Sequence, residues 1–371
     1  MLFMCLHDKV YKNCILIQAI ALSWLHCRIK TRKRTRNTIL VLFFVCGNAA
    51  YSTLSYSEQR SSKASLQAAG QWFSDTQTIM GTNIEVQLWA NDRSQGIQAI
   101  KLVMSEMQRI NLLMSTYIET SEVSLLNKTA YSHAVSVSQE LFDLLLLSKN
   151  INAITDGAFD ITYASVGHLY QYADKQKPNE QTLAQQAKAI NMNFVVLDAS
   201  ALSVKFIKKN VRIDLGGIAK GHAVDASIKL LEQAGIRHAL VTAGGDTKLL
   251  GDRLGKPWIV GIRDPRNRQK QAVIVPLENT AMSTSGDYER YFEQDGLRYH
   301  HILSPKTGKS ATGVQSVSII SDNSTVNDAL STAVFVMGVQ AGLTLINKMD
   351  DVDAIIMDDQ RKMHYSKGLV Q

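Results

Sequence analysis

The 371-residue chain has no cysteine after position 46, because all four cysteines (Cys5, Cys14, Cys27 and Cys46) lie near the N-terminus. The rest of the chain therefore cannot contain a cysteine nucleophile, a cysteine-ligated zinc ion or an intramolecular disulfide. A chain without thiols over its main part is compatible with an oxidising compartment.

The main part of the chain also has no excess of positive charge. The formal net charge of +7 is accounted for by residues 1–50, which contain eight Lys/Arg and one Asp, whereas the remainder has 32 basic and 32 acidic residues. A balanced surface releases few counterions from a phosphate backbone, so we expect no nucleic-acid partner. The overall content of 45% hydrophobic and 20% charged residues is typical of a globular protein with a sizeable core.

No long hydrophobic run is present around the N-terminal basic segment. The apolar stretch at residues 39–46 follows a basic run at residues 30–36 and precedes small residues at 47–50, and eight apolar residues are too few to span a bilayer. This order predicts an export signal within residues 1–50 and a periplasmic protein. The region is long for a signal, which indicates an over-extended start codon or an uncleaved anchor. An uncleaved N-terminus, or a lipid on Cys46, would attach the protein to the inner membrane, although Val45 disfavours acylation.

The organisation after residue 50 is predicted from composition and periodicity. Residues 51–72 are rich in Ser and Gln and are expected to form a flexible tether, followed by a folded domain over residues 73–371. Expected strands outnumber helices and are joined by short glycine turns, which predicts an α+β fold with antiparallel or mixed sheets. About 300 residues exceed the usual size of a single core, so we expect two lobes with a cleft between them.

Several well-known catalytic motifs are absent: the chain has no H-E-x-x-H, no G-x-S-x-G and no EF-hand loop. Residues 211–222 instead read as a strand over 211–215, a glycine-rich turn and the start of a helix over 218–234. Glycines at a helix N-terminus favour an anion site, although this turn is neither a P-loop nor a dinucleotide-binding turn. A glycine turn required only for packing is the alternative.

A second candidate site lies at the start of a helix expected over residues 325–337. Asp328 and Thr332 are four residues apart and project from one face, where a carboxylate and a hydroxyl can share a hard cation such as Mg²⁺. The alternative is structural: Thr325 and Asp328 fit a capping box, and Thr332 could bond to a backbone carbonyl.

Adjacent histidines, His300 and His301, end a strand expected over residues 298–303. Their side chains project to opposite faces, so at most one of them points into a cleft. A hydrogen-bonded structural histidine is the alternative.

Taken in chain order, these and other short motifs resemble the ApbE-like FAD:protein FMN transferases over about residues 73–350. The motifs are Met80-Gly-Thr, Ser115-Thr-Tyr, Ser121-Glu-Val-Ser-Leu-Leu-Asn127, Asp156-Gly-Ala-Phe-Asp160, Asp214-Leu-Gly-Gly-Ile-Ala-Lys-Gly with Asp225, Ala243-Gly-Gly-Asp246, Thr284-Ser-Gly-Asp-Tyr288, His301-Ile, Thr307-Gly308, and Asp328-Ala-Leu-x-Thr332 with Phe335-Val-Met-Gly338.

The resemblance implies a Mg²⁺-dependent, exported enzyme that cleaves FAD, transfers FMN to a threonine hydroxyl of an acceptor protein and releases AMP. The acceptor would be a periplasmic or membrane-associated electron-transfer subunit, and FAD would lie between the two lobes. By motif position, the metal ligands would be the Gly217 carbonyl and the side chains of Asp328 and Thr332. The implied FAD contacts are Met80, Tyr117, Ala158, Phe159, Asp160, Lys220, His301 and Ile302.

Phosphoryl transfer to a hydroxyl also requires a base, for which His301 is the first candidate and Asp287 and Asp160 are the alternatives. The chain departs from the family pattern at Ser304, where an aspartate is usual, and in the loop at residues 171–181, which lacks the usual tryptophan. Two other functions use the same residues: an FAD pyrophosphatase, with water in place of the threonine, and a non-enzymatic periplasmic flavin binder.

Overall fold

The computed structural model describes residues 70–370, and the predicted export signal and residues 51–69 of the predicted tether lie outside this range. The first strand, β1, begins at Gln71, so the last two residues assigned to the tether belong to the sheet. Within the described range no helix is long and apolar enough to cross a membrane.

An eight-stranded sheet forms the centre of the protein, and every pair of neighbouring strands in it is antiparallel. Its strands, in spatial order, are β1 (Gln71–Ile79), β2 (Thr82–Ala90), β6 (Ala239–Ala243), β7 (Asp246–Leu250), β10 (Ala281–Gly286), β13 (Val314–Ser321), β14 (Asp353–Asp358) and β15 (Met363–Tyr365). All eight residues of β13 are buried, because both faces of the sheet are covered at this strand.

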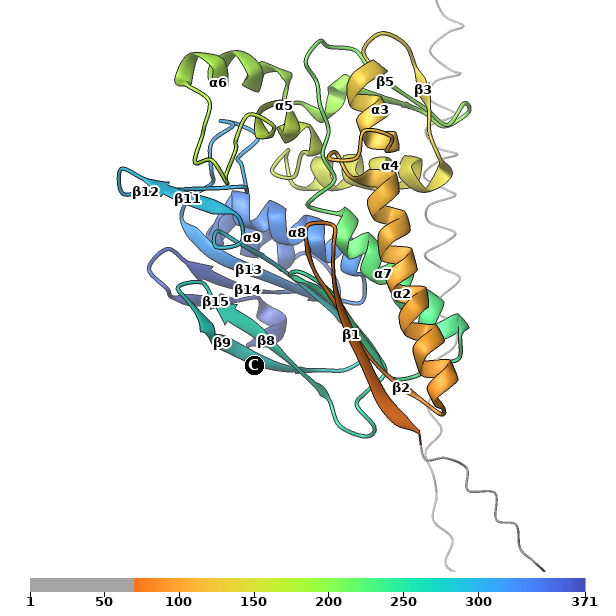
Figure 1. Ribbon diagram of the computed structural model, residues 1–371. Coiled ribbons are helices and arrows are strands. Elements are labelled where there is room, and N and C mark those ends of the chain that lie inside the picture. Colours follow the sequence, from red (N-terminus) through yellow and green to blue (C-terminus); the bar gives the residue numbers. More distant parts are fainter. Residues whose placement is uncertain (1–69, 371) are drawn as a thin grey trace, which may run out of the picture. The chain divides into compact units, whose positions relative to one another are not determined.

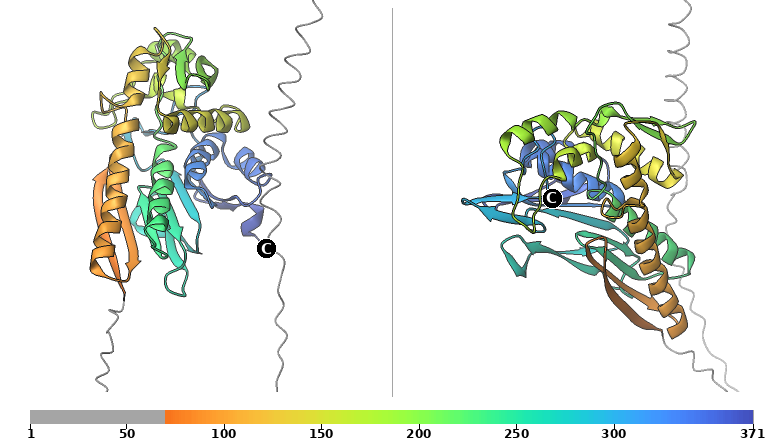
Figure 2. Two further views of the ribbon diagram at one scale, coloured as in Figure 1. Left: turned by 90° about the vertical axis from the view of Figure 1, so that its right-hand side faces the viewer. Right: turned by 45° about the horizontal axis from the view of Figure 1, so that its top comes forward.

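The two faces of the sheet have different covers. The helices α2 (Arg93–Met114), α7 (Ala219–Gln233), α8 (Ser324–Met337) and α9 (Val339–Ile346) pack on one face (Figures 1 and 2). A hairpin of β8 (Trp258–Asp264) and β9 (Asn267–Leu277) covers the other. Successive side chains of β13 project to alternate faces of the sheet. Val317 and Ile319 pack with α8 on one face, and Ile320 packs with Trp258 of β8 on the other.

Residues 115–215 form a second, mainly helical part above one end of the sheet, which we call the helical lobe; the remainder is the sheet lobe (Figure 1). The helical lobe contains α3 (Glu122–Thr129), α4 (Gln139–Ile154), α5 (Ala164–Gly167), α6 (Glu180–Gln186), the 3-10 turns η1 (Ile161–Tyr163), η2 (Ala187–Ala189) and η3 (Met192–Phe194), and a small sheet of β3 (Val135–Ser136), β5 (Ser203–Phe206) and β4 (Val195–Asp198). The largest hydrophobic core runs through both lobes, from Val86 and Met107 to Leu141 and Phe206.

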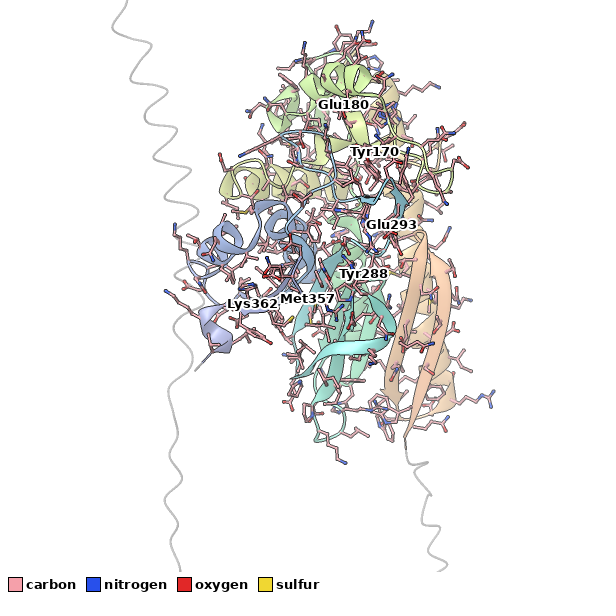
Figure 3. The ribbon with its side chains drawn as sticks, turned by 90° about the vertical axis from the view of Figure 1, so that its left-hand side faces the viewer. Tyr170, Glu180, Tyr288, Glu293, Met357 and Lys362 are labelled. Carbon is pink, nitrogen blue, oxygen red and sulfur yellow. The ribbon has the colours of Figure 1, made fainter. Side chains whose placement is uncertain are left out.

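A second hairpin, β11 (Tyr291–Gln294) and β12 (Leu297–His300), extends from the sheet lobe towards the helical lobe. Tyr172 donates a hydrogen bond to the His300 carbonyl (3.3 Å), and its ring lies 6.2 Å from that of Phe292. Figure 3 marks this junction, with Tyr170 on the helical lobe and Glu293 on the hairpin. The chain ends in the 3-10 turn η4 (Lys367–Leu369).

The helices expected over residues 94–113, 139–155, 218–234 and 325–337 are confirmed, with ends that differ by one residue. The strand expected over residues 211–215 is wrong. Val211, Ile213 and Leu215 are buried as the alternation predicts, but the Asn127 side-chain amide, instead of a neighbouring strand, accepts from the Ile213 amide (2.7 Å) and donates to its carbonyl (2.9 Å).

Candidate functional site

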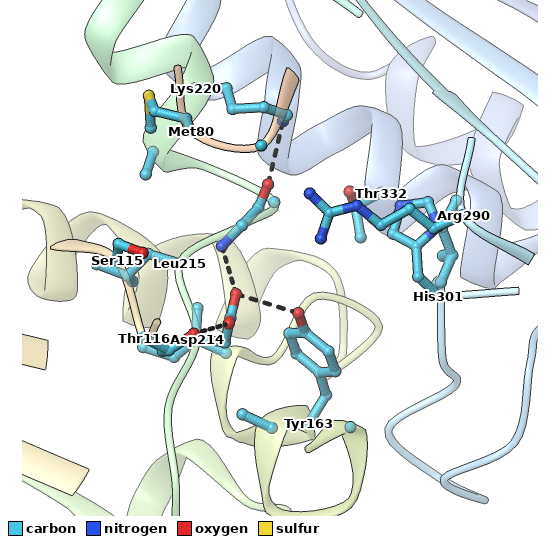
Figure 4. A pocket seen from close by; sticks show the side chains of 18 of the residues that line it. Met80, Ser115, Thr116, Tyr163, Asp214, Leu215, Lys220, Arg290, His301 and Thr332 are labelled. Carbon is cyan, nitrogen blue, oxygen red and sulfur yellow. Dashed lines mark hydrogen bonds between the residues drawn. The ribbon is translucent and has the colours of Figure 1, made fainter. Parts of the chain in front are cut away.

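One deep cavity of about 1060 Å³ lies between the helical lobe and the sheet lobe (Figure 4). Its wall combines the β1–β2 turn, the loop after α2, residues 158–173, the segment that enters α7, and parts of β10 and α8. All the site residues implied by the family resemblance line it: Met80, Tyr117, Ala158, Phe159, Asp160, Gly217, Lys220, His301, Ile302, Asp328 and Thr332.

The cavity floor at α7 and α8 depends on two glycines one helical turn apart. A Cβ atom at Gly217 would lie 3.2 Å from Thr332 Oγ1, and one at Gly221 would lie 2.9 Å from Asp328 Cβ. The two helices can approach this closely only without side chains at these positions. As a result, Gly217 faces Thr332 while Asp328 lies one turn below it on the same face of α8.

Lys220 forms a buried cluster with two carboxylates at this floor. Its Nζ lies 2.8 Å from Asp246 Oδ2 and 3.1 Å from Asp328 Oδ2, and Asp328 also accepts from the Gly221 amide (3.1 Å). Burial lowers the pKa of Lys220, but the two carboxylates outweigh it and raise that pKa overall. Burial and the charge of Asp246 raise the pKa of Asp328.

The structural alternative for the start of α8 is wrong in its details. The N-cap is Asn323, whose side chain accepts from the Val326 amide (2.9 Å), and Thr325 donates instead to Asp225 of α7 (2.6 Å). Thr332 Oγ1 lies 3.2 Å from the Ser285 hydroxyl. Asp328 therefore does not cap its own helix.

Three amides of the glycine-rich turn have partners within the chain. The Gly216 amide donates to Asp214 Oδ1 (2.7 Å), and the Ile218 and Ala219 amides both donate to the Leu215 carbonyl (2.9 and 2.8 Å). The glycines permit the close approach of α7 to α8.

His300 and His301 point to opposite sides of the β11–β12 hairpin, as the alternation predicts. His300 is buried beside the Ala311 carbonyl (2.8 Å), whereas His301 lines the cavity. Burial and the neighbouring His300, Arg290 and Lys220 lower the pKa of His301 to about 3, and its Nδ1 is buried without a hydrogen-bond partner in the described chain. The imidazole is therefore neutral at pH 7.

The alternative bases have other partners. Asp160 accepts from the Thr162 amide and hydroxyl and from the Met192 amide, and burial raises its pKa. Asp287 lies outside the cavity wall and is held by Arg266 through two bonds of 2.7 and 2.6 Å. Neither carboxylate is free to approach a substrate hydroxyl.

Sequence reasoning missed a polar network on the facing wall. Asp214 accepts from the Thr116 hydroxyl (3.0 Å) and the Tyr163 hydroxyl (3.2 Å) as well as from Gly216 (Figure 4). Burial, then the charge of Asp214, raises the pKa of Tyr163 well above its usual value. Thr116 and Asp214 belong to the quoted motifs, but only the tertiary structure brings them together.

The oxygen atoms at the floor suit a hard cation that shares its coordination with a ligand. The described residues contain no group of three or more His, Cys, Asp or Glu placed to hold a metal by themselves. A carboxylate (Asp328), a hydroxyl (Thr332) and a carbonyl (Gly217) supply the oxygen ligands that Mg²⁺ prefers and leave positions for phosphate oxygens. Gly217 lies close to Thr332, and Asp328 is one turn away on α8, where its carboxylate contacts the Lys220 ammonium.

The fold and site thus define an α+β protein with a deep cavity, a cluster of oxygen donors at its floor and a neutral histidine. Residues 80–356 match the ApbE family, and the chain belongs to that family of enzymes. Curated relatives are the FAD:protein FMN transferases of Treponema pallidum (31% identical, 80% of this chain and 88% of the relative) and Klebsiella pneumoniae (30%, 78% and 90%).

Solved structures agree with this assignment. The ApbE protein of Thermotoga maritima superposes with a TM-score of 0.75 at 32% identity, covering 80% of this chain and 98% of that one. The flavin transferase ApbE of Vibrio cholerae superposes with a TM-score of 0.71 at 25% identity over the same shares. The protein is therefore an FAD:protein FMN transferase by family, with the mixed α+β fold of that family.

Proposed function

We propose that the protein transfers the FMN half of FAD to a threonine hydroxyl of an acceptor protein, releases AMP and requires Mg²⁺. The observation that carries this proposal is the meeting of Gly217, Asp328 and Thr332 with His301 in one cavity of a chain of the ApbE family. FAD is proposed to lie in this cavity, between the two lobes.

The cavity has the size and lining for such a ligand. Drug-sized ligands occupy pockets of about 300–1000 Å³, and this one has about 1060 Å³. Phe159 and Ile302 supply buried apolar surface, while the ring of Tyr117 is 85% exposed and is available to pack on an aromatic ligand. Met80, Ala158, Asp160 and Lys220 complete the proposed contacts.

At the floor, the Gly217 carbonyl, Asp328 and Thr332 would hold Mg²⁺, which supplies positive charge to the diphosphate during phosphoryl transfer. Lys220 holds Asp328 in place through its ion pair and balances part of the charge of Asp246. Gly221 fixes the spacing of α7 and α8, and hence the position of the Asp328 carboxylate.

The chemical step exchanges the phosphoanhydride bond between the two phosphates of FAD for a phosphoester bond to threonine. The threonine oxygen forms a bond to the phosphorus of the FMN half, the bond from that phosphorus to the bridging oxygen breaks, and AMP leaves with the electron pair. His301 accepts the proton of the threonine hydroxyl, for which its imidazole is already neutral. Ser304 lies outside the cavity wall, in a turn where its backbone carbonyl accepts a hydrogen bond from the Gly308 amide (2.7 Å).

We also propose that the protein works in the periplasm on a periplasmic or membrane-associated electron-transfer subunit. The support is the basic and apolar pattern of residues 1–50 and the absence of cysteine thereafter.

The test is incubation of the purified full-length chain with FAD, Mg²⁺ and a threonine-containing candidate acceptor. In-gel flavin fluorescence of the acceptor together with one AMP per label is the expected result. Release of AMP and free FMN without labelling would indicate the pyrophosphatase, and FAD binding without AMP would indicate a flavin binder.

A further inference from the structure

The Arg290 side chain projects into the cavity beside His301. The His301 amide donates to the Arg290 carbonyl (3.1 Å), which extends the β11–β12 pairing by one residue beyond Tyr291 and His300. Residues opposite each other in an antiparallel pair project to the same side. Arg290 and His301 therefore share one face of the hairpin, and both line the cavity (Figure 4).

Arg290 has no ion-pair partner among the described residues, unlike Arg263, Arg266 and Arg298; Arg212, on the helical-lobe wall of the cavity, also has none. Arg266 and Arg298 both contact Asp287, and Arg263 pairs with Glu289. Lys220 is held by two carboxylates at the floor. The guanidinium of Arg290 is thus available to a ligand.

The charge of the cavity indicates which ligand this cation serves. At the floor, two acidic groups, Asp246 and Asp328, face one basic group, Lys220. Asp214 adds a further carboxylate on the facing wall. In the glycine-rich turn, the amides of Gly216, Ile218 and Ala219 have partners within the chain and are not available to a ligand. A bound diphosphate would add negative charge to this acidic environment. Its binding therefore requires a further positive group besides the proposed metal ion.

We propose that Arg290 binds the diphosphate of FAD from the hairpin side, facing the cation site formed by Gly217, Asp328 and Thr332. The inference rests on the proposed function for the identity of the ligand. A guanidinium offers two parallel donors that match phosphate oxygens, and such charge-assisted bonds are among the strong ones. The same charge lowers the pKa of His301 next to it, so that the imidazole is neutral before the reaction.

The experiment compares the binding of two flavins to the full-length chain by quenching of flavin fluorescence, in EDTA so that no metal contributes. FAD carries the diphosphate and riboflavin does not. In Arg290→Met we expect FAD affinity to fall by about 10–100-fold, the range of a lost charged hydrogen bond, and riboflavin affinity to stay within about twofold of wild type. Arg290→Lys, which keeps the charge without the fork, should lie between the two.

Arg237→Met is the matched control, because Arg237 is exposed and lies outside the cavity wall. It should bind both flavins as wild type does, and thermal melting of each variant reports folding. Unchanged FAD affinity in Arg290→Met would overturn the inference, as would an equal loss for both flavins, which would indicate a role in packing.

The binding comparison also separates this inference from the proposed function, since it does not depend on turnover. A wild-type chain that releases no AMP would contradict the proposed function, while a selective loss of FAD binding in Arg290→Met would still support a diphosphate-binding arginine.

Discussion

The crossing of α7 and α8 at Gly221 predicts that a substitution there lowers transfer activity much more than it lowers stability. In Gly221→Ala the new Cβ would lie 2.9 Å from Asp328 Cβ and would overlap the Ser324 carbonyl oxygen, whereas ordinary contact begins at about 3.4 Å. The Ser324 carbonyl is backbone and cannot rotate away. Relief of the contact with the Ser324 oxygen requires helix α8 to move from α7 by about 1 Å, and α8 carries Asp328 and Thr332 with it.

The expected energies follow from two opposed effects. Overpacking a close contact costs about 1–3 kcal/mol, and replacing glycine by alanine within a helix recovers about 1 kcal/mol. The free energy of unfolding should therefore fall by no more than about 2 kcal/mol. Displacement of catalytic groups by about 1 Å can cost about 10²-fold in rate, so kcat/KM for FMN transfer should fall far more than the stability loss suggests.

The assay measures thermal stability and kcat/KM for transfer side by side in Gly221→Ala and Gly96→Ala. Gly96 is also a helical glycine under close contact, since its Cβ would lie 2.6 Å from Phe73 Cγ, but it belongs to α2 outside the cavity wall. Gly96→Ala should lose stability and keep its activity. The reasoning fails if Gly221→Ala transfers FMN within about threefold of wild type, or if both variants lose activity equally.

Three further predictions concern the metal site, the histidine and the N-terminus. Asp328→Asn should lower Mg²⁺-dependent transfer by about 10²-fold or more, and wild-type rates across a Mg²⁺ titration would reduce Asp328 to a packing residue. Because the pKa of His301 is lowered to about 3, the acid limb of kcat/KM should lie well below pH 6.5. Unfolded His301 binds a proton near pH 6.5 and the native residue does not, so acidification from pH 7 to 4 should remove up to about 1.4 kcal/mol of stability per pH unit; denaturant titrations should show a shallower dependence in His301→Gln. N-terminal sequencing of the exported protein should begin between residues 48 and 52, and a full-length cytoplasmic product would contradict the proposed location.

The sequence by itself determined the local elements and the residues of the candidate site. The 3–4 residue spacing of buried side chains predicts α2 to within one residue at each end, and the alternation at 211–215 identifies which side chains are buried. Strand β1 escaped prediction because it is an edge strand with mostly polar, exposed side chains. The site residues implied by the family resemblance, from Met80 to Thr332, all line one cavity.

Only the tertiary structure decided what these residues contact. Residues 211–215 form no strand because the Asn127 amide, 86 residues away in the chain, takes the place of a neighbouring strand. Asp287 forms ion pairs with Arg266 and Arg298, whereas Arg290 has no such partner among the described residues and lines the cavity. Periodicity encodes which face of an element is buried, but the partner of a polar group depends on the long-range packing of other elements, and no local pattern specifies it.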